Sequence, residues 1–112
     1  MNEPRLPSKS DLLASLTQHG NVGASRGITA RRLGARLACN ERHVRTLVTQ
    51  LREDGVAVCG KPSDGYFVAR EPGEVEDTCQ FLRARALKSL QLEARLRRVP
   101  LPELIGQLRL ET

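Results

Sequence analysis

The spacing of hydrophobic residues is most regular in the stretch 41–54, which predicts an amphipathic helix. One face of this helix carries apolar residues at the i, i+3, i+4 and i+7 positions, namely Val44, Leu47, Val48 and Leu51. Asn40 stands where an N-cap is expected, and Gly55 stands where a helix commonly ends. We therefore expect a helix with one buried face and one polar face turned to solvent.

Two shorter amphipathic helices are expected before it. Ser10 can cap a helix over 11–19, whose apolar residues are Leu12, Leu13 and Leu16. Thr29 can cap a second helix over 30–37, whose apolar face consists of Ala30, Leu33 and Leu37. Because only about three residues separate this second helix from the helix at 41–54, the two form a helix-turn-helix.

The pattern then changes to that of β-strands. Two short runs rich in β-branched and aromatic residues, 56–59 and 66–69, flank the segment 60–65. That segment contains Gly, Pro and an Asp-Gly pair, which is typical of a hairpin loop. A hairpin directly after the second helix of a helix-turn-helix is a wing.

A long helix is expected after the hairpin, over 74–99, with Pro100 and Pro102 ending it and a short segment 104–110 behind. One apolar stripe should pack on the preceding domain and consists of Val75, Cys79, Leu82, Ala86 and Leu90. Further apolar residues lie outside this stripe, and we expect them to form a homodimer contact within residues 74–110. The alternative is that this tail folds back over its own core.

The fold class expected is α+β and mainly α. It comprises a flexible N-terminal arm at 1–10, a winged helix-turn-helix domain of three helices plus a β-hairpin at 11–70, and a C-terminal helical extension at 71–112. The length of 112 residues suits one small domain with its own core.

The positive charge is unevenly distributed along the chain. The net charge is +5, and residues 26–70 alone hold nine basic and four acidic residues, while the flanks 1–25 and 71–112 are each neutral. A local basic excess of this kind is typical of a nucleic-acid-binding face, although a solvated surface can also produce it.

The polar face of the helix at 41–54 carries the side chains expected to meet bases in the major groove. Arginine can bond guanine through two hydrogen bonds, and threonine can contact base edges. The expected base contacts are Arg42, His43, Arg45, Thr46 and Thr49. The expected contacts to the DNA backbone are Arg26, Arg31, Arg32, Arg36 and, at the wing, Lys61.

The stretch 28–69 resembles the winged helix-turn-helix of the biotin-operon-repressor type. The resemblance lies in the Leu33-Gly34 pair, in the Leu51-Arg52-Glu53-Asp54-Gly55-Val56 segment and in Gly65-Tyr66. It implies a DNA-binding fold with a recognition helix and a wing. Ala38 stands where that family has a turn glycine, and the ligase and biotin-binding region is absent, so no enzymatic activity carries over. The C-terminal half is loosely similar to small phage- and prophage-encoded regulators.

Other functional classes receive no support from the residues. Cys39, Cys59 and Cys79 are far from zinc-site spacing and are expected to be small core residues. No nucleophile, base or metal constellation is recognisable, so we expect no enzyme, no cofactor and no small-molecule ligand. Aromatic residues make up 3%, which argues against a single-strand binder. No membrane span or secretory pattern is evident, and we expect a cytoplasmic protein.

The sequence thus predicts sequence-specific binding of double-stranded DNA by a small transcriptional regulator, with helix 41–54 in the major groove and the wing at 59–66 on the backbone. One alternative is a replication-accessory protein that binds the origin of a mobile element. Another is a winged-helix protein-interaction module with no sequence-specific DNA binding.

Overall fold

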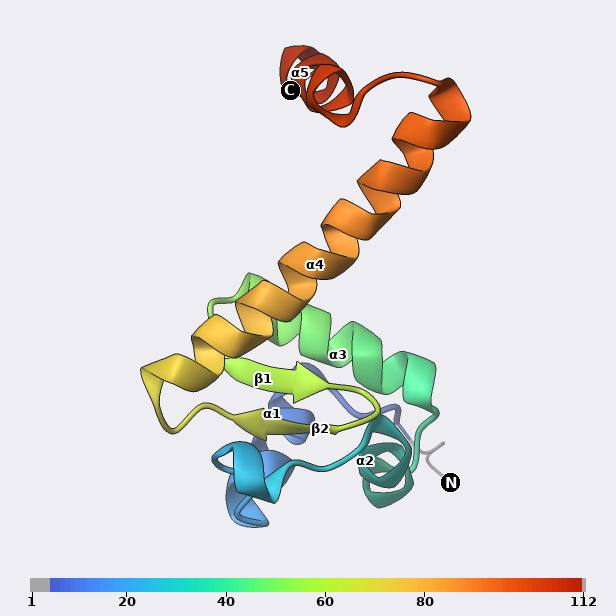
Figure 1. Ribbon diagram of the computed structural model, residues 1–112. Coiled ribbons are helices and arrows are strands. Elements are labelled where there is room, and N and C mark those ends of the chain that lie inside the picture. Colours follow the sequence, from blue (N-terminus) through green and yellow to red (C-terminus); the bar gives the residue numbers. More distant parts are fainter. Residues whose placement is uncertain (1–4, 112) are drawn as a thin grey trace. The chain divides into compact units, whose positions relative to one another are not determined.

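The computed structural model describes residues 5–111, and these are mainly helical with one two-stranded antiparallel hairpin (Figure 1). In chain order the elements are α1 (Lys9–Gln18), the 3-10 turn η1 (Ala24–Arg26), α2 (Ala30–Leu37), α3 (Glu41–Glu53), β1 (Val58–Lys61), β2 (Gly65–Val68), α4 (Pro72–Arg97) and α5 (Leu101–Glu111). The chain divides into two compact units, the first ending at Thr78 and the second beginning at Cys79. The expected class, α+β and mainly helical with a long helix after the hairpin, is confirmed.

The first helix, α1, starts earlier than the sequence suggested, because its N-cap is Ser8 and not Ser10. The Ser8 hydroxyl accepts a hydrogen bond from the Asp11 backbone N–H at 3.2 Å, and the Asp11 carboxylate accepts one from the Ser8 N–H at 2.8 Å. This reciprocal pair is a capping box, which requires a polar acceptor three residues after the cap. Ser10 has Leu13 at that position, so it lies inside the helix instead. The hydrogen bonds from Ser8 also lower the pKa of Asp11.

The three helices α1, α2 and α3 pack around one apolar core, to which the hairpin contributes Val58 and Tyr66. The predicted apolar stripe of α3 is fully confirmed, since Val44, Leu47, Val48 and Leu51 are all buried. The other buried members of this core are Leu12, Leu16, Ile28, Ala30 and Leu33. The burial of one face of α3 leaves its polar face on the surface.

The turn between α2 and α3 is closed by a left-handed alanine. Ala38 has φ = 56°, and the next residue, Cys39, donates its backbone N–H to the Gly34 carbonyl at 2.9 Å. Alanine adopts this backbone at a cost of about 1 kcal/mol relative to glycine, so the turn forms without the glycine usual there. Gly34 is required by packing, because a Cβ atom at that position would lie 2.6 Å from the Cys39 carbonyl oxygen.

The hairpin pairs Val58 with Val68 and Lys61 with Gly65. The strand bounds expected from sequence, 56–59 and 66–69, are therefore wrong by two residues and by one. The reason is that α3 uses Val56 for its own termination: the Val56 N–H donates to the Leu51 carbonyl at 2.9 Å.

A third extended segment lies on the other edge of β2. Ile28 and Tyr66 exchange both backbone hydrogen bonds, at 2.9 and 2.7 Å, and Val22 pairs with Val68. The segment between α1 and α2 is therefore tied to the hairpin at two points. These bonds fix where α2 begins relative to β2.

The long helix α4 begins at Pro72 and ends at Arg97, while α5 begins at Leu101. The expected bounds, 74–99 and 104–110, are shifted because Pro72 and Pro102 lie in first helical turns rather than acting as breakers. A proline there loses no hydrogen bond, since the first backbone N–H groups of a helix have no partner within it. Arg98 takes a left-handed backbone with φ = 56° and ends α4.

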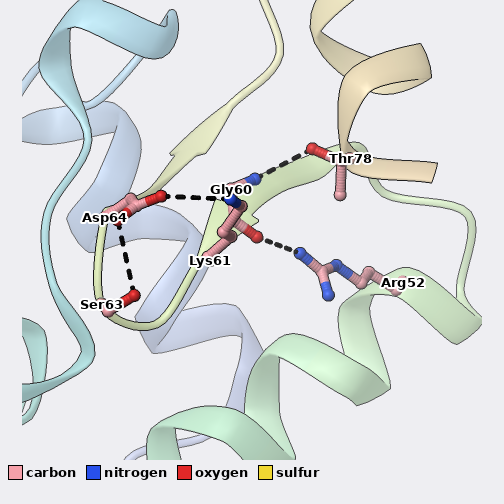
Figure 2. A network of polar contacts seen from close by, with 6 residues as sticks. All are labelled: Arg52, Gly60, Lys61, Ser63, Asp64 and Thr78. Carbon is pink, nitrogen blue, oxygen red and sulfur yellow. Dashed lines mark hydrogen bonds and ion pairs between the residues drawn. The ribbon is translucent and has the colours of Figure 1, made fainter. Parts of the chain in front are cut away.

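The first two turns of α4 are attached to the first unit by two side chains. The Glu74 carboxylate accepts backbone N–H groups from Ala24 at 2.5 Å and from Arg70 at 2.7 Å. The buried Thr78 hydroxyl accepts the Gly60 N–H of β1 at 3.0 Å, as Figure 2 shows. The start of α4 is thus positioned by the hairpin and by η1.

The residues of the apolar stripe expected along α4 lie largely on the surface of that helix. Val75, Cys79, Leu82 and Ala86 are exposed and Leu90 is half-buried. The expectation that every cysteine occupies a core position is also wrong for Cys79, although Cys59 is buried and Cys39 half-buried. Among residues 79–109, the buried apolar residues are Ala94 and Leu104. Helical periodicity identifies an apolar face but does not identify what covers it.

Replacing Gly34 with alanine is expected to destabilise the first unit by about 1–3 kcal/mol, because the new methyl group meets a backbone carbonyl that cannot rotate away. Gly73→Ala is the matched control, since a Cβ atom there meets nothing within 4 Å. Urea denaturation followed by circular dichroism measures both variants. Equal stabilities for the two variants would contradict the close approach of Gly34 to Cys39.

Glu74 is expected to make the stability of the protein dependent on acid pH. Backbone hydrogen bonds from Arg70, Ala24 and Glu71 lower the pKa of Glu74 from its ordinary value of 4.5. Because the pKa of Glu74 is lower in the folded state, its stabilisation of the fold is complete above about pH 4.5. The stabilisation is lost as the pH falls through the pKa of the folded state. Glu74→Gln should therefore be less stable than wild type at neutral pH, and the difference should shrink at about pH 3. Urea midpoints at both pH values test this. Asp77→Asn is the control for loss of a neighbouring carboxylate. If the difference in stability between wild type and Glu74→Gln stayed constant with pH, the role of the Glu74 carboxylate would be refuted.

Candidate nucleic-acid interface

The exposed face of α3 carries a shallow, open hollow of about 440 Å³. It is lined by Arg42, Arg45, Thr46, Thr49, Gln50 and Glu53, all of them from this one helix. The hollow contains four of the five residues expected from sequence to contact bases. Arg42 and Arg45 are exposed, and neither forms an ion pair or side-chain hydrogen bond with a described residue. Both guanidinium groups therefore keep their donors available for an external acceptor.

The two threonines of this face are ordered by their own helix. The Thr46 hydroxyl donates to the Arg42 carbonyl at 3.1 Å, and the Thr49 hydroxyl donates to the Arg45 carbonyl at 3.0 Å. Each hydroxyl oxygen retains lone pairs, so it can still accept a hydrogen bond from a base amino group. The hydrogen bonds hold the side chains in place before any ligand arrives.

His43, the fifth expected base contact, does not join the other four. Its Nε2 atom lies 2.9 Å from the Pro7 carbonyl oxygen, and the side chain is half-buried. Its backbone N–H donates to the side chain of the N-cap Asn40 at 2.7 Å. His43 therefore connects the start of α3 to the segment before α1. Sequence could not show this, because the acceptor is a backbone carbonyl 36 residues away.

The residues expected to contact the DNA backbone fall into two groups. Arg31 and Arg32 are exposed in the first turn of α2, and Arg26 is exposed in η1. Arg36 is instead engaged within the first unit, because its guanidinium donates to the Asn21 side chain at 2.8 Å and to the Ser15 hydroxyl at 3.4 Å. The structure gives Arg36 a role in holding α1, α2 and the following segment together.

Lys61 lies at the end of β1, next to the hairpin turn. Its ammonium group is 3.4 Å from the Asp64 carboxylate, which also lies within 3.5 Å of the Ser63 hydroxyl (Figure 2). Both partners of the ion pair are solvent-exposed, at 44% and 67%, so the pair contributes at most about 1 kcal/mol. A phosphate could therefore displace Asp64 at small cost.

Arg52 has a role that sequence reasoning missed. It belongs to α3 and donates to the Val58 carbonyl at 2.8 Å and to the Gly60 carbonyl at 3.1 Å. Its guanidinium also lies over the Tyr66 ring, 5.9 Å from the ring centre. Figure 2 shows this side chain reaching from α3 to the hairpin. Arg52 thereby fixes the hairpin relative to the face that carries Arg42 and Arg45.

Gln50 and Glu53 are further residues of the hollow that were not expected as base contacts. Glutamine can pair with adenine, and a carboxylate can accept from the cytosine amino group. Glu53 also places a negative charge at the C-terminal end of the face, whereas Arg42 and Arg45 lie toward its N-terminal end. The face is therefore polarised along α3.

Within residues 5–111 no helix is long and apolar enough to cross a membrane. The same residues contain no cluster of three or more His, Cys, Asp or Glu side chains arranged to hold a metal ion. The polar face of α3 is the candidate site in the described part of the chain.

No protein-family model, curated protein or solved structure matches this chain. The candidate interface must therefore be interpreted from its own geometry and chemistry.

Proposed function

We propose that the protein binds double-stranded DNA in a sequence-specific manner and acts as a small transcriptional regulator. The observation that carries the proposal is the exposed face of α3. On it, two arginines whose guanidinium groups have no partner within residues 5–111 and two ordered threonines lie above a fully buried apolar stripe. Arginine and threonine on one helical face are the side chains that read base edges in the major groove.

The dimensions of this face suit a short DNA site. Arg42 and Thr49 are seven residues apart, which is about 10 Å along a helix, or about three base pairs of B-DNA. Arg42 and Arg45 are suited to guanine, while Gln50 is suited to adenine. We therefore propose a short, guanine-containing recognition element for each copy of the protein.

The surrounding elements support the same proposal. Two short helices joined by a tight turn, followed by a hairpin, form an arrangement that resembles a winged helix-turn-helix. In this proposal α3 enters the major groove, the hairpin lies on the sugar–phosphate backbone, and Lys61, Arg31, Arg32 and Arg26 contact phosphates. Arg52 contributes by keeping the hairpin in place.

Two alternatives are distinguished by experiment. An origin-binding replication protein would recognise a sequence in the same way. It would be distinguished from a regulator by where its binding sites lie in the genome. A protein-interaction module would use the same arginines for an acidic partner and would show no base preference. We propose no enzymatic activity.

The proposal is tested by selection from a random pool of DNA duplexes with wild type, Arg42→Ala and Arg45→Ala. Wild type should yield one motif, and each variant should lose preference at one position, with a cost of about 1–3 kcal/mol on the wild-type site. Lys61→Ala is the matched control, because loss of a phosphate contact weakens all duplexes equally. Recovery of no motif by wild type, with binding that disappears as salt rises, would reject the regulator proposal.

We also propose that residues 74–110 form a homodimer contact. The supporting observation is the exposure of large apolar side chains on α4, where Leu92 and Leu96 are 54% and 87% exposed. A two-fold symmetric motif in the selection and a dimer mass by sedimentation at roughly tens of micromolar are the expected results. The contact would be excluded if wild type is already monomeric and the Leu92→Glu and Leu96→Glu variants are monomeric as well.

A further inference from the structure

The second compact unit carries most of the excess positive charge. When the chain is divided at Thr78, residues 1–78 hold eleven basic and ten acidic residues, a net charge of +1, and residues 79–112 hold seven basic and three acidic residues, a net charge of +4. The basic excess of 26–70 is offset within the first unit by Glu71, Glu74, Glu76 and Asp77 at the start of α4. When counted by unit, the net positive charge of the chain therefore lies largely beyond Thr78.

The cations of this region are concentrated in α4 and its end. Those that are exposed and form no ion pair with a described residue are Arg83, Arg85, Lys88, Arg95 and Arg98. The exception is Arg97, which lies 2.8 Å from Glu93, the one acidic residue between positions 83 and 98. A run of exposed like charges destabilises a free helix by self-repulsion. An external anion would remove that repulsion.

The directions of these cations favour a DNA duplex over a lipid surface. At 100° per residue, Arg83 and Lys88 lie about 140° apart around α4, and Arg95 lies close to the direction of Lys88. A helix with cations on two sides can meet the phosphates that border a DNA groove on both sides. A lipid surface requires an uninterrupted apolar face. Here Arg85 and Ser89 stand between Leu82 and Leu92.

Attachment to the first unit makes such contacts effective. The Thr78 hydroxyl holds the start of α4 to β1, and Arg83 lies only five residues later, about 8 Å along the helix. Because the chain is continuous, the cations of the second unit remain tethered to any duplex that the first unit binds. Tethering of this kind makes the second binding event intramolecular, so weak contacts raise the overall affinity.

We propose that the basic stretch 83–98 binds the phosphate backbone of the same DNA duplex that α3 contacts. The proposal rests on the proposed function, since it takes the DNA duplex as the partner. The stretch is about 22 Å long, so it would extend the protected DNA by about six base pairs. In this arrangement α3 supplies base preference and α4 supplies affinity that is independent of sequence.

The test compares wild type with the triple variant Arg83→Gln, Lys88→Gln, Arg95→Gln by fluorescence anisotropy between about 50 and 200 mM salt. The probes are a duplex with the selected motif and long flanks, the same duplex with a scrambled motif, and one trimmed to the motif. On both long duplexes the variant should bind roughly tenfold or more weakly, and its salt slope should fall by about 2–3. On the trimmed duplex the two proteins should differ much less.

The matched control is the double variant Ser89→Ala, Gln91→Ala, which alters exposed uncharged residues of the same helix and should bind as wild type does. Equal salt slopes for wild type and the triple variant would overturn the inference and leave the proposed function standing. A reduced slope without any sequence preference in wild type would reject the proposed function and retain the α4 contact. If wild type bound phosphatidylserine-rich vesicles, the triple variant did not, and both had the same salt slope on DNA, the cations would be assigned to lipid. That result would also overturn the inference.

Discussion

The buried stripe of α3 is the constraint on which the rest of the structure depends. Val44, Leu47, Val48 and Leu51 are each removed from water by α1, α2 and the hairpin, and burial of four such side chains supplies several kcal/mol toward folding. Rotation of α3 about its axis would expose this stripe. The same burial therefore fixes the direction of Arg42 and Arg45, and the geometry of the candidate interface follows from the packing of the core.

The hairpin is attached to α3 by polar contacts that complement the apolar packing. Arg52 bonds two carbonyl groups of β1, while the opposite edge of the hairpin is held by the backbone exchange between Ile28 and Tyr66. Thr78 accepts the N–H group of Gly60, the residue whose carbonyl Arg52 also bonds. Carbonyl and amide groups of a short two-stranded sheet are costly to leave without partners. These contacts therefore keep a small hairpin ordered beside the interface.

Much of this fold was predictable from sequence, because local rules determine it. Helix α2, helix α3 with its Asn40 cap, and the buried face of α3 all follow from spacing and capping chemistry. The features that sequence did not reveal depend on partners remote in the chain. His43 bonds the Pro7 carbonyl, and Arg36 bonds Asn21. Cys79 is exposed, because burial of its side chain would require a neighbouring element to pack on that face of α4. For the interface, the spacing predicted which residues share the face, but it could not show which cations the protein itself engages.

The alanine at the turn between α2 and α3 has a consequence for how rigidly α3 is presented. The left-handed region available to Ala38 is narrow, whereas a glycine there could move through a broad range of backbone angles. The angle between the two helices is therefore restrained by a steep local energy well as well as by packing. A helix held in this way loses little motional entropy when it docks into a groove, so less of its interaction energy is spent on ordering.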